Sequence, residues 1–461
     1  MTEVAHGLSE TRPDDDLAAT VRPRPLSLAI PALAFLVLAS AGMLLEVEPF
    51  ISFFYMSAWY PTLILLDSAV AARTGRYYLI TRPRFALSLL GWSAVLWFFF
   101  EVINFRVQNW YYVSLPPDLP VRWLGIAIAF ATVLPAIFLA ERLLEGGGRG
   151  GRGAFVADRW PTFKVGRGLL RGLFVAGVAF VVLSLWWPRI FFPLIWGALT
   201  LLLEPWNYSR DRDRSLVGDL AAGRPGRFLR LLVGGAFIGF IWELYNIEAR
   251  AKWIYTVPGF ESFKLFEMPL LGFVGFPVLA LDCFVVYQSL VLAGVAVPPE
   301  LGRNRRIPPR RVLGAAAAAV IFSLAALVGM DRWNTDSTVP RLDDLWLAEP
   351  AAIERLAAAR YDDLFQLAES SPADLAKTAG VTPALAQSWI DAAQLITLRG
   401  LGARNARLLW EIGITSVDEL AGSDAEQIGA QIRAIAVRPR SATPPKVRVW
   451  VEAARRASTA G

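Results

Sequence analysis

Long apolar blocks constrain this chain more than any other feature of its sequence. A helix needs roughly 20 apolar residues to cross the ~30 Å hydrocarbon core of a bilayer, and most of these blocks have about that length. Hydrophobic residues make up 55% of the 461 positions, and charged residues make up 19%. We therefore predict an all-α fold built as a polytopic membrane helix bundle. The nine predicted spans are residues 27–45, 50–72, 85–105, 122–144, 168–187, 189–204, 227–246, 269–297 and 312–330.

Clusters of arginine predict the orientation of these spans. They follow the second, fourth, sixth and eighth spans, and short loops rich in Lys and Arg stay on the cytoplasmic side. We expect a multi-pass protein of the cell inner membrane with a cytoplasmic N-terminus. An odd number of spans then places the C-terminal part on the opposite side. Residues 1–26 are polar, with Asp14-Asp15-Asp16 and several prolines, and predict a disordered leader. They are not a secretory signal, because they lack its apolar region and cleavage site.

Matching residues recur at a constant separation along the apolar region. Glu101 matches Glu243 (243 − 101 = 142), and Asn104 matches Asn246 at the same offset, within the strings FEVINFRVQNWYYVSLP and WELYNIEARAKWIYTVP. The constant offset predicts an internal duplication of a four-span unit, with a pseudo-twofold axis along the membrane normal. The predicted order is a first repeat at 27–145, a Gly/Arg-rich linker at 146–167, a second repeat at 168–297, and a basic loop with the ninth span at 298–330.

Two rare residue types exclude several kinds of site. The chain has one cysteine, Cys283, and one histidine, His6. An intrachain disulfide is therefore impossible, and neither a Cys- or His-ligated metal nor a Ser-His-Asp triad is expected. We predict no metal and no cofactor, so any acid–base chemistry must use Asp, Glu, Tyr, Lys or Arg.

Two polar stripes inside the apolar region are the candidate functional residues. Glu101 and Asn104 share one helix face in the third span, and Glu243, Asn246 and Arg250 repeat that spacing in the seventh. Ionisable groups inside a membrane are costly, so each is a candidate site. Glu101 and Glu243 are the candidate catalytic pair, converging between the repeats, with Arg250 keeping Glu243 ionised. The candidate binding residues are Asn104, Asn246, Arg250, Lys252, Trp253, Tyr255, Glu267 and Asp282. The same polar groups could instead hold helices together by hydrogen bonds.

Residues 331–461 predict a soluble helical domain with a basic tail, because long apolar runs are few and Ala and Leu recur at helical spacing. Its stretch LRGLGARNARLLWEIGITSVDELA resembles a helix-hairpin-helix unit, with Gly400 and Gly402 in the hairpin. That resemblance implies DNA backbone binding, but acidic and basic residues nearly balance here, whereas a nucleic-acid footprint is basic. Nucleic acid is thus an unlikely partner, and a protein partner or self-association through 341–435 is favoured.

The membrane region resembles a family of uncharacterised bacterial polytopic membrane proteins through WELYN, AKWIYTVP and KLFEMPLLGFVGFPVLALDC. A fainter resemblance to membrane-bound carotenoid cyclases implies an intramembrane enzyme. The adjacent Glu pair of those enzymes is absent, since Glu267-Met268-Pro269 stands there. The predicted function is handling of a small molecule or lipid, as a transporter or intramembrane enzyme, at an outward-facing site between the repeats, with membrane lipids as partners. The alternatives are a membrane anchor or scaffold that displays the C-terminal domain, and a carotenoid-cyclase-like enzyme.

Overall fold

A computed structural model of the chain describes residues 24–145, 160–257, 264–299, 309–435 and 442–460. Within these ranges the protein is mostly helical, and nine helices are long and apolar enough to cross a membrane. The prediction of nine long apolar helices is therefore confirmed for this part of the chain. Most of the predicted leader, most of the Gly/Arg-rich linker and part of the basic tail lie outside the described residues.

The apolar helices follow one another along the chain. The first four candidate spans are α2 (Pro25–Leu44), α3 (Phe50–Thr74), α4 (Pro83–Val107) and the pair α5 (Leu119–Phe130) and α6 (Val133–Leu144). The next four are α7 (Arg167–Trp186); α8 (Pro188–Phe191) with η1 (Phe192–Ile195) and α9 (Ala198–Arg210); α11 (Gly226–Glu248); and η3 (Leu270–Val274) with α12 (Gly275–Leu292). Helix α13 (Pro309–Trp333) is the ninth.

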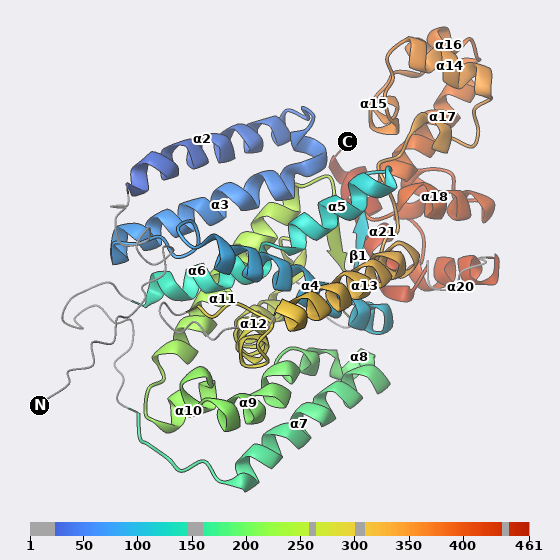
Figure 1. Ribbon diagram of the computed structural model, residues 1–461. Helices are drawn as coiled ribbons and strands as arrows, with labels where there is room; N and C mark the ends of the chain where they lie inside the picture. Colours follow the sequence, from blue (N-terminus) through green and yellow to red (C-terminus); the bar gives the residue numbers. More distant parts are fainter. Residues whose placement is uncertain (1–23, 146–159, 258–263, 300–308, 436–441, 461) are drawn as a thin grey trace, which may run out of the picture.

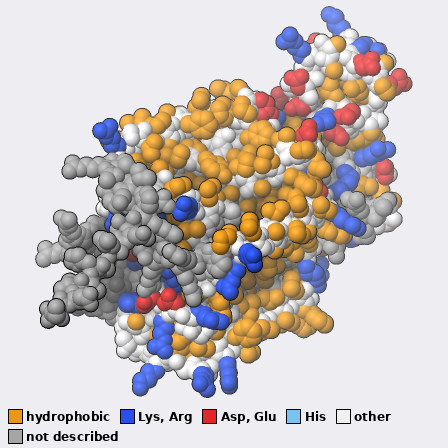
Figure 2. All heavy atoms as spheres, viewed as in Figure 1, with side chains coloured by type: hydrophobic (Ala, Val, Ile, Leu, Met, Phe, Trp, Pro, Cys, Tyr) orange, Lys and Arg blue, Asp and Glu red, His pale blue; other side chains and the backbone are white. Residues whose placement is uncertain are grey.

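The long helices run side by side, and the start of α2 lies at the opposite end of the bundle from the C-terminal domain (Figure 1). Apolar side chains cover the visible face of the bundle, whereas charged side chains gather towards its two ends (Figure 2). On α2 and α13, the side chains of Ile30 and Ile321 are 64% and 69% exposed. A soluble protein rarely exposes so continuous an apolar surface, so this face is suited to contact with lipid chains.

Two buried carboxylates organise the loops at the end of the bundle that carries the start of α2. Asp67, near the end of α3, accepts hydrogen bonds from the backbone N–H groups of residues 78–80 at 2.5–3.0 Å. Glu204 of α9 accepts from Ser215 Oγ and from the N–H groups of residues 216 and 217 at 2.5–3.0 Å. Each carboxylate satisfies backbone donors that would otherwise be buried without partners. The second candidate span in each group of four thus ends in the same way.

A short antiparallel ribbon interrupts the helical architecture. Strand β1 (Trp110–Val113) follows α4, and β2 (Lys252–Tyr255) follows α11. Trp110 pairs with Tyr255, and Tyr112 pairs with Trp253. Residues 334–339 run alongside β1 through bridges from Tyr112 to Thr335 and from Leu115 to Thr338. The sequence predicted helices alone, and the ribbon, with a second small pair β3 (Lys264–Leu265) and β4 (Met268–Pro269), is the exception.

The C-terminal helices form a core of their own. They are η4 (Leu342–Asp344), α14 (Pro350–Ala358), α15 (Leu364–Ala368), α16 (Pro372–Ala379), α17 (Pro383–Thr397), α18 (Gly402–Glu411), α19 (Val417–Ala421), α20 (Ala425–Ile435) and α21 (Pro444–Ala460). Side chains of Ser371, Thr382 and Ser416 accept backbone N–H groups at three helix starts, which ends the preceding turn and fixes the helix boundary. The core packs around the fully buried Trp389 and Trp450.

Candidate functional site

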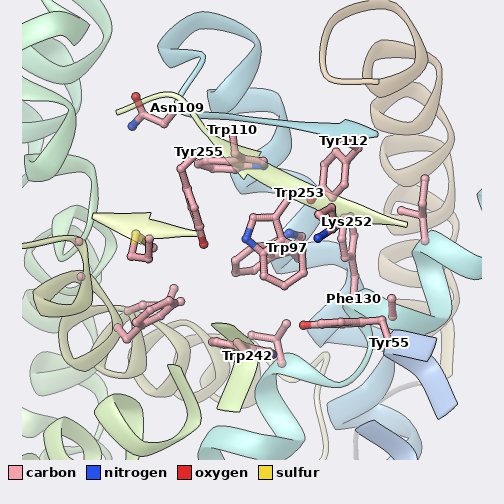
Figure 3. A pocket seen from close by; sticks show the side chains of 18 of the residues that line it. Tyr55, Trp97, Asn109, Trp110, Tyr112, Phe130, Trp242, Lys252, Trp253 and Tyr255 are labelled. Atoms are coloured by element: carbon pink, nitrogen blue, oxygen red, sulfur yellow. The ribbon is translucent and has the colours of Figure 1, made fainter. Parts of the chain in front are cut away.

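A cavity of about 400 Å³ lies between the first four apolar helices and the next four. Its wall is mostly apolar and strongly aromatic, and Trp97, Trp110, Trp242 and Tyr255 surround the open space in Figure 3. The ring centroids of Trp97 lie 6.0 Å from Trp242 and 6.5 Å from Trp110. Ligand sites are typically concave, lined by apolar and aromatic groups and supplied with a few polar atoms. This cavity has the same character.

The ribbon separates the cavity from the C-terminal domain, because side chains alternate between the two faces of a strand. Trp110 and Tyr112 of β1 and Tyr255 of β2 line the cavity. Tyr111 and Ile254 face the other way and pack with Val449 of α21. A ribbon of two four-residue strands thus forms one wall of the cavity and the docking surface of the C-terminal domain.

Glu101 is fully buried behind the cavity wall and does not line the cavity. Its Oε1 accepts from Tyr112 Oη at 2.6 Å and from Trp110 Nε1 at 3.0 Å. Its Oε2 accepts from Asn334 Nδ2, directly after α13, at 2.5 Å. Both carboxyl oxygens therefore have partners, and they fix the positions of two aromatic side chains that do line the cavity.

Glu243 has a similar setting in the other group of helices. It is fully buried, lies behind the wall, and its Oε1 accepts from Tyr255 Oη at 2.8 Å. Its Oε2 has no hydrogen-bond partner among the described residues. The structure gives the two carboxylates separate sets of partners, and no described hydrogen bond joins them.

Tyr112 and Tyr255 lie in the strands and donate their hydroxyl hydrogens to Glu101 and Glu243. Burial is the main cause that raises the pKa of Tyr112 well above its ordinary value, and the Glu101 carboxylate raises it further. Burial and Glu243 raise the pKa of Tyr255 in the same way. Each phenol therefore stays protonated and donates to its carboxyl group.

The two asparagines shape the turns from helix to strand. Asn104 donates to the Trp110 carbonyl at 2.8 Å and accepts from the Asn109 N–H at 2.9 Å. Asn246 donates to the Trp253 carbonyl and accepts from its N–H, at 2.9 and 3.1 Å. Neither lines the cavity. Their side chains bond to backbone groups and position the ribbon. This is a structural role, which the sequence left open beside a binding role.

Arg250 does not pair with Glu243, and that part of the expectation was wrong. Its guanidinium instead lies 3.1 Å from Glu46 and 3.4 Å from Asp363 of the C-terminal domain, and it stacks over Phe365 at 4.2 Å. The reason is local, because α11 ends at Glu248 and the backbone of Ala249 is extended, so Arg250 no longer follows the helical spacing.

Lys252 and Glu267 form an ionic cluster with the C-terminal domain. Lys252 Nζ donates to the Ile247 carbonyl and lies 3.9 Å from Glu267. The buried Glu267 also pairs with Arg399, which lies directly before the glycine hairpin. Lys252 lines the aromatic cavity and a second cavity of about 270 Å³ between the bundle and the C-terminal domain. The cluster therefore connects the two parts of the chain.

Asp282 was predicted as a binding residue, but it does not line the cavity. Its carboxylate accepts from the Gly197 N–H at 2.8 Å and from the N–H and hydroxyl of Thr200 at 2.7 and 2.6 Å. These groups lie in the first turn of α9, whose backbone donors have no partners inside the helix. Asp282 therefore acts as a helix cap supplied from α12.

The glycine hairpin of the C-terminal domain rests on the ribbon. Gly400 and Gly402 have φ of +85° and +74°, a region that glycine adopts without steric cost. The Gly400 carbonyl accepts from Tyr111 Oη at 3.1 Å and from Trp450 Nε1 at 2.7 Å. Nearby, Lys446 Nζ lies 2.7 Å from Asp336 and 4.5 Å from the centre of the Tyr111 ring. The hairpin therefore contacts the ribbon of the same chain through the Gly400 carbonyl.

Several wall residues were not singled out from the sequence. Trp97 lies four positions before Glu101, so its place on the same helix face was a usable signal. Tyr55, Trp196 and Trp242 carried no signal that separated them from interfacial aromatics. Asn334 lies 233 positions from Glu101, and its role depends on the path of the ninth span.

Comparisons with known proteins identify one region. Residues 351–457, which cover most of the C-terminal domain, match the family described as "Domain of unknown function (DUF4332)". No curated protein matches the chain, and no solved structure does. The match supports a separate C-terminal domain and leaves the helical bundle to be interpreted from its own geometry.

Proposed function

We propose that the bundle spans a membrane and binds an apolar small molecule or lipid in the aromatic cavity. The single observation that carries this proposal is the cavity itself, about 400 Å³ in volume and walled by aromatic side chains from both groups of helices. Burial of apolar ligand surface is favourable at roughly 25 cal/mol per Å², so such a wall selects for ligands that carry little charge.

The ligand enters sideways from the bilayer. Leu271 and Val274 line the cavity, belong to the eighth candidate span, and are 61% and 63% exposed. An opening at these residues faces lipid chains when the bundle is embedded. A molecule dissolved in the membrane then reaches the cavity without crossing water.

An internal duplication accounts for the position of the cavity. The repeated features are the loop carboxylates Asp67 and Glu204, the Glu–Tyr pairs, and the asparagines that hold the ribbon. The ribbon requires one correction to the constant offset. Tyr112 and Tyr255 have equivalent partners at a separation of 143 (255 − 112), so the second copy carries one extra residue between its asparagine and its strand. The pseudo-twofold axis then passes through the pair Tyr111 and Ile254, beside the cavity.

We place the ribbon and the C-terminal domain on the outer side. The described loops with several arginines, which follow α3 and α9, lie with the start of α2 at the other end of the bundle, and such loops stay cytoplasmic. The cavity is then in the outer half of the membrane, below the ribbon, as an outward-facing site.

Filling the cavity is expected to remove the bound molecule. Gly125 lines the cavity, and a Cβ at this position would have Met56 Cε at 3.7 Å as its only near neighbour, so the fold accepts a larger residue. We expect Gly125→Leu to reduce the amount of apolar molecule that co-purifies with the protein at least tenfold. The measurement is mass spectrometry of an organic extract of protein purified from its native membrane.

The matched control is Gly91→Leu. Gly91 lies on α4, is exposed, has no neighbour within 4 Å of an added Cβ, and is not part of the cavity wall. This variant should carry the same molecule as the wild-type protein. A wild-type protein without any enriched molecule, or a Gly125→Leu protein that retains it, would contradict the proposal.

The alternative is that the bundle is an anchor or scaffold for the C-terminal domain. Asn104, Asn246 and Asp282 favour it, because their side chains bond to backbone groups and do not line the aromatic cavity. If the C-terminal domain is a helix-hairpin-helix unit, its hairpin is used for docking on the ribbon, which argues against nucleic acid as its partner. A scaffold predicts equal extracts from the two leucine variants and from the wild type.

A further inference from the structure

The second cavity, about 270 Å³ in volume, is lined by basic side chains from both parts of the chain. Arg250 and Lys252 come from the segment after α11, and Arg399 lies directly before the glycine hairpin. Their side chains are 14%, 15% and 34% exposed, so each keeps surface that a bound molecule can reach. Glu46 is the one acidic residue among the described residues of this wall. The wall therefore presents a net positive charge to the cavity.

Two further carboxylates lie behind the basic groups and hold them in place. The buried Glu267 pairs with Arg399 and lies 3.9 Å from Lys252, so these two cations are neighbours. Asp363 lies 3.4 Å from Arg250. Neither carboxylate lines the cavity. They balance the charge of the cations but leave the space in front of them open to another group.

The two guanidinium groups have donors to spare. A guanidinium carries five N–H donors, and the described hydrogen bonds use two of them in Arg250 and one in Arg399. Arg250 also lies 4.2 Å from the centre of the Phe365 ring, which limits its movement. Its other partner, Glu46, lies 3.1 Å away but is 68% exposed, so it turns into solvent at little cost. An incoming anion can therefore replace Glu46 at Arg250.

We propose that the second cavity binds a phosphate group between Arg250, Lys252 and Arg399. A phosphate group presents oxygens in several directions, and guanidinium groups bind it through paired hydrogen bonds. A carboxylate presents only two oxygens in one plane, which suits donors from two parts of the chain less well. The site is separate from the ligand of the aromatic cavity, and it requires only that the C-terminal domain is docked.

The surroundings of the cavity favour a phospholipid as the source of this phosphate. Met43 and Ile51, on either side of the connection from α2 to α3, also line the cavity. Leu44 and Leu45, at the end of α2, are exposed beside it. In a bundle that spans a membrane, a headgroup then reaches the cavity while its acyl chains lie along α2. This choice of source rests on the membrane position in the proposed function, whereas free phosphate offers the same group without it.

The test compares three probes with the same oleoyl chain: 1-oleoylglycerol 3-phosphate, 1-oleoylglycerol and oleate. Inorganic phosphate is the fourth probe. Binding to the full chain, purified in detergent without added phosphate, is measured by isothermal titration calorimetry. We expect the lipid phosphate to bind at least tenfold more tightly than oleoylglycerol and oleate, because hydrogen bonds between charged groups have that effect. Inorganic phosphate should bind more weakly than the lipid phosphate, because it has no acyl chain.

Matched variants locate the phosphate. Arg399→Gln should weaken binding of the lipid phosphate at least tenfold. Arg407→Gln loses the same charge from a side chain that is 63% exposed and does not line the cavity, so its affinity should equal that of the wild type. Glu46→Gln keeps the pair between Arg399 and Glu267 and removes the competing anion. Binding to this variant should be about fivefold tighter, as the loss of one unit charge at this range in water implies.

Each other outcome has a separate meaning. Equal binding of the lipid phosphate and either oleoylglycerol or oleate would overturn the phosphate site. Unchanged affinity in both Arg399→Gln and Glu46→Gln would overturn it as well, because the phosphate would then bind elsewhere. Inorganic phosphate that binds as tightly as the lipid phosphate would support the site and assign it to a soluble phosphate.

The Gly125→Leu protein separates this proposal from the proposed function. Gly125 lines the aromatic cavity and not the second cavity, so this variant should bind the lipid phosphate as the wild type does. Loss of binding in Gly125→Leu would place the lipid in the aromatic cavity and overturn the phosphate site. An aromatic cavity that binds nothing would contradict the proposed function and leave the phosphate site standing.

Discussion

Alanine at position 400 is expected to detach the C-terminal domain from the ribbon. Gly400 has φ of +85°, and an added Cβ would lie 2.6 Å from Tyr111 Oη and 3.2 Å from Ile254 Cδ1. A Cβ contact below 3.0 Å cannot be accommodated without movement of the ribbon or the hairpin. The left-handed backbone alone costs a non-glycine residue roughly 1–2 kcal/mol. The clash adds to this cost and strains the bonds that Tyr111 and Trp450 make to the Gly400 carbonyl.

Limited proteolysis in detergent measures the detachment. Cleavage between the ninth span and α14 should be at least tenfold faster in Gly400→Ala than in the wild-type protein. Gly413→Ala is the matched control, because Gly413 has φ of +88° and an added Cβ there has no neighbour within 4 Å. That variant has the backbone cost without the clash, so its cleavage rate should stay close to that of the wild type. Equal rates for the two variants would show that the hairpin does not depend on the ribbon.

Removal of Glu101 is expected to destabilise the bundle more than removal of Glu243. In Glu101→Leu, the donors of Trp110, Tyr112 and Asn334 lose their acceptor. Each buried donor left unpaired costs roughly 1–3 kcal/mol, so we expect a loss of about 3 kcal/mol or more. In Glu243→Leu, only Tyr255 loses an acceptor, and an unsatisfied oxygen is removed as well. Its loss should be roughly 1–2 kcal/mol.

Denaturant titration in detergent micelles compares the free energies of unfolding of these two variants with that of the wild type. The order Glu101→Leu, Glu243→Leu, wild type, from least to most stable, is the expected result. Equal losses in the two variants would contradict the difference in partners. The contact from Asn334 accounts for part of the difference, and Asn334→Leu should therefore lose less than Glu101→Leu.

The long helices could be predicted from the sequence because length and apolar content are local properties. The polar stripes were also visible, since Glu101 and Asn104, or Glu243 and Asn246, share a face through helical spacing alone. The sequence did not indicate which groups these side chains contact. Each of the asparagines bonds to backbone beyond the end of its own helix, at a turn that ends the helical spacing.

The remaining differences come from contacts between distant parts of the chain. Arg250 was assigned to Glu243 by extending a helix that ends before it, and its partners Glu46 and Asp363 lie 204 and 113 positions away. Asp282 stabilises the start of α9, 82 positions or more away. The four-residue strands resemble an interfacial aromatic belt in sequence, because Trp and Tyr favour both positions. Only pairing of the two strands with each other distinguishes a ribbon from a belt.

The most direct test of the cavity site is a structure of the protein purified from its native membrane, determined by cryo-electron microscopy at a resolution that shows side chains. We expect continuous density of a molecule that the chain does not supply, enclosed by Trp97, Trp110, Trp196 and Trp242. The Gly125→Leu protein should lack this density while the same rings keep their positions. A wild-type cavity without such density, closed by contact between the aromatic rings, would show that the cavity is not a binding site.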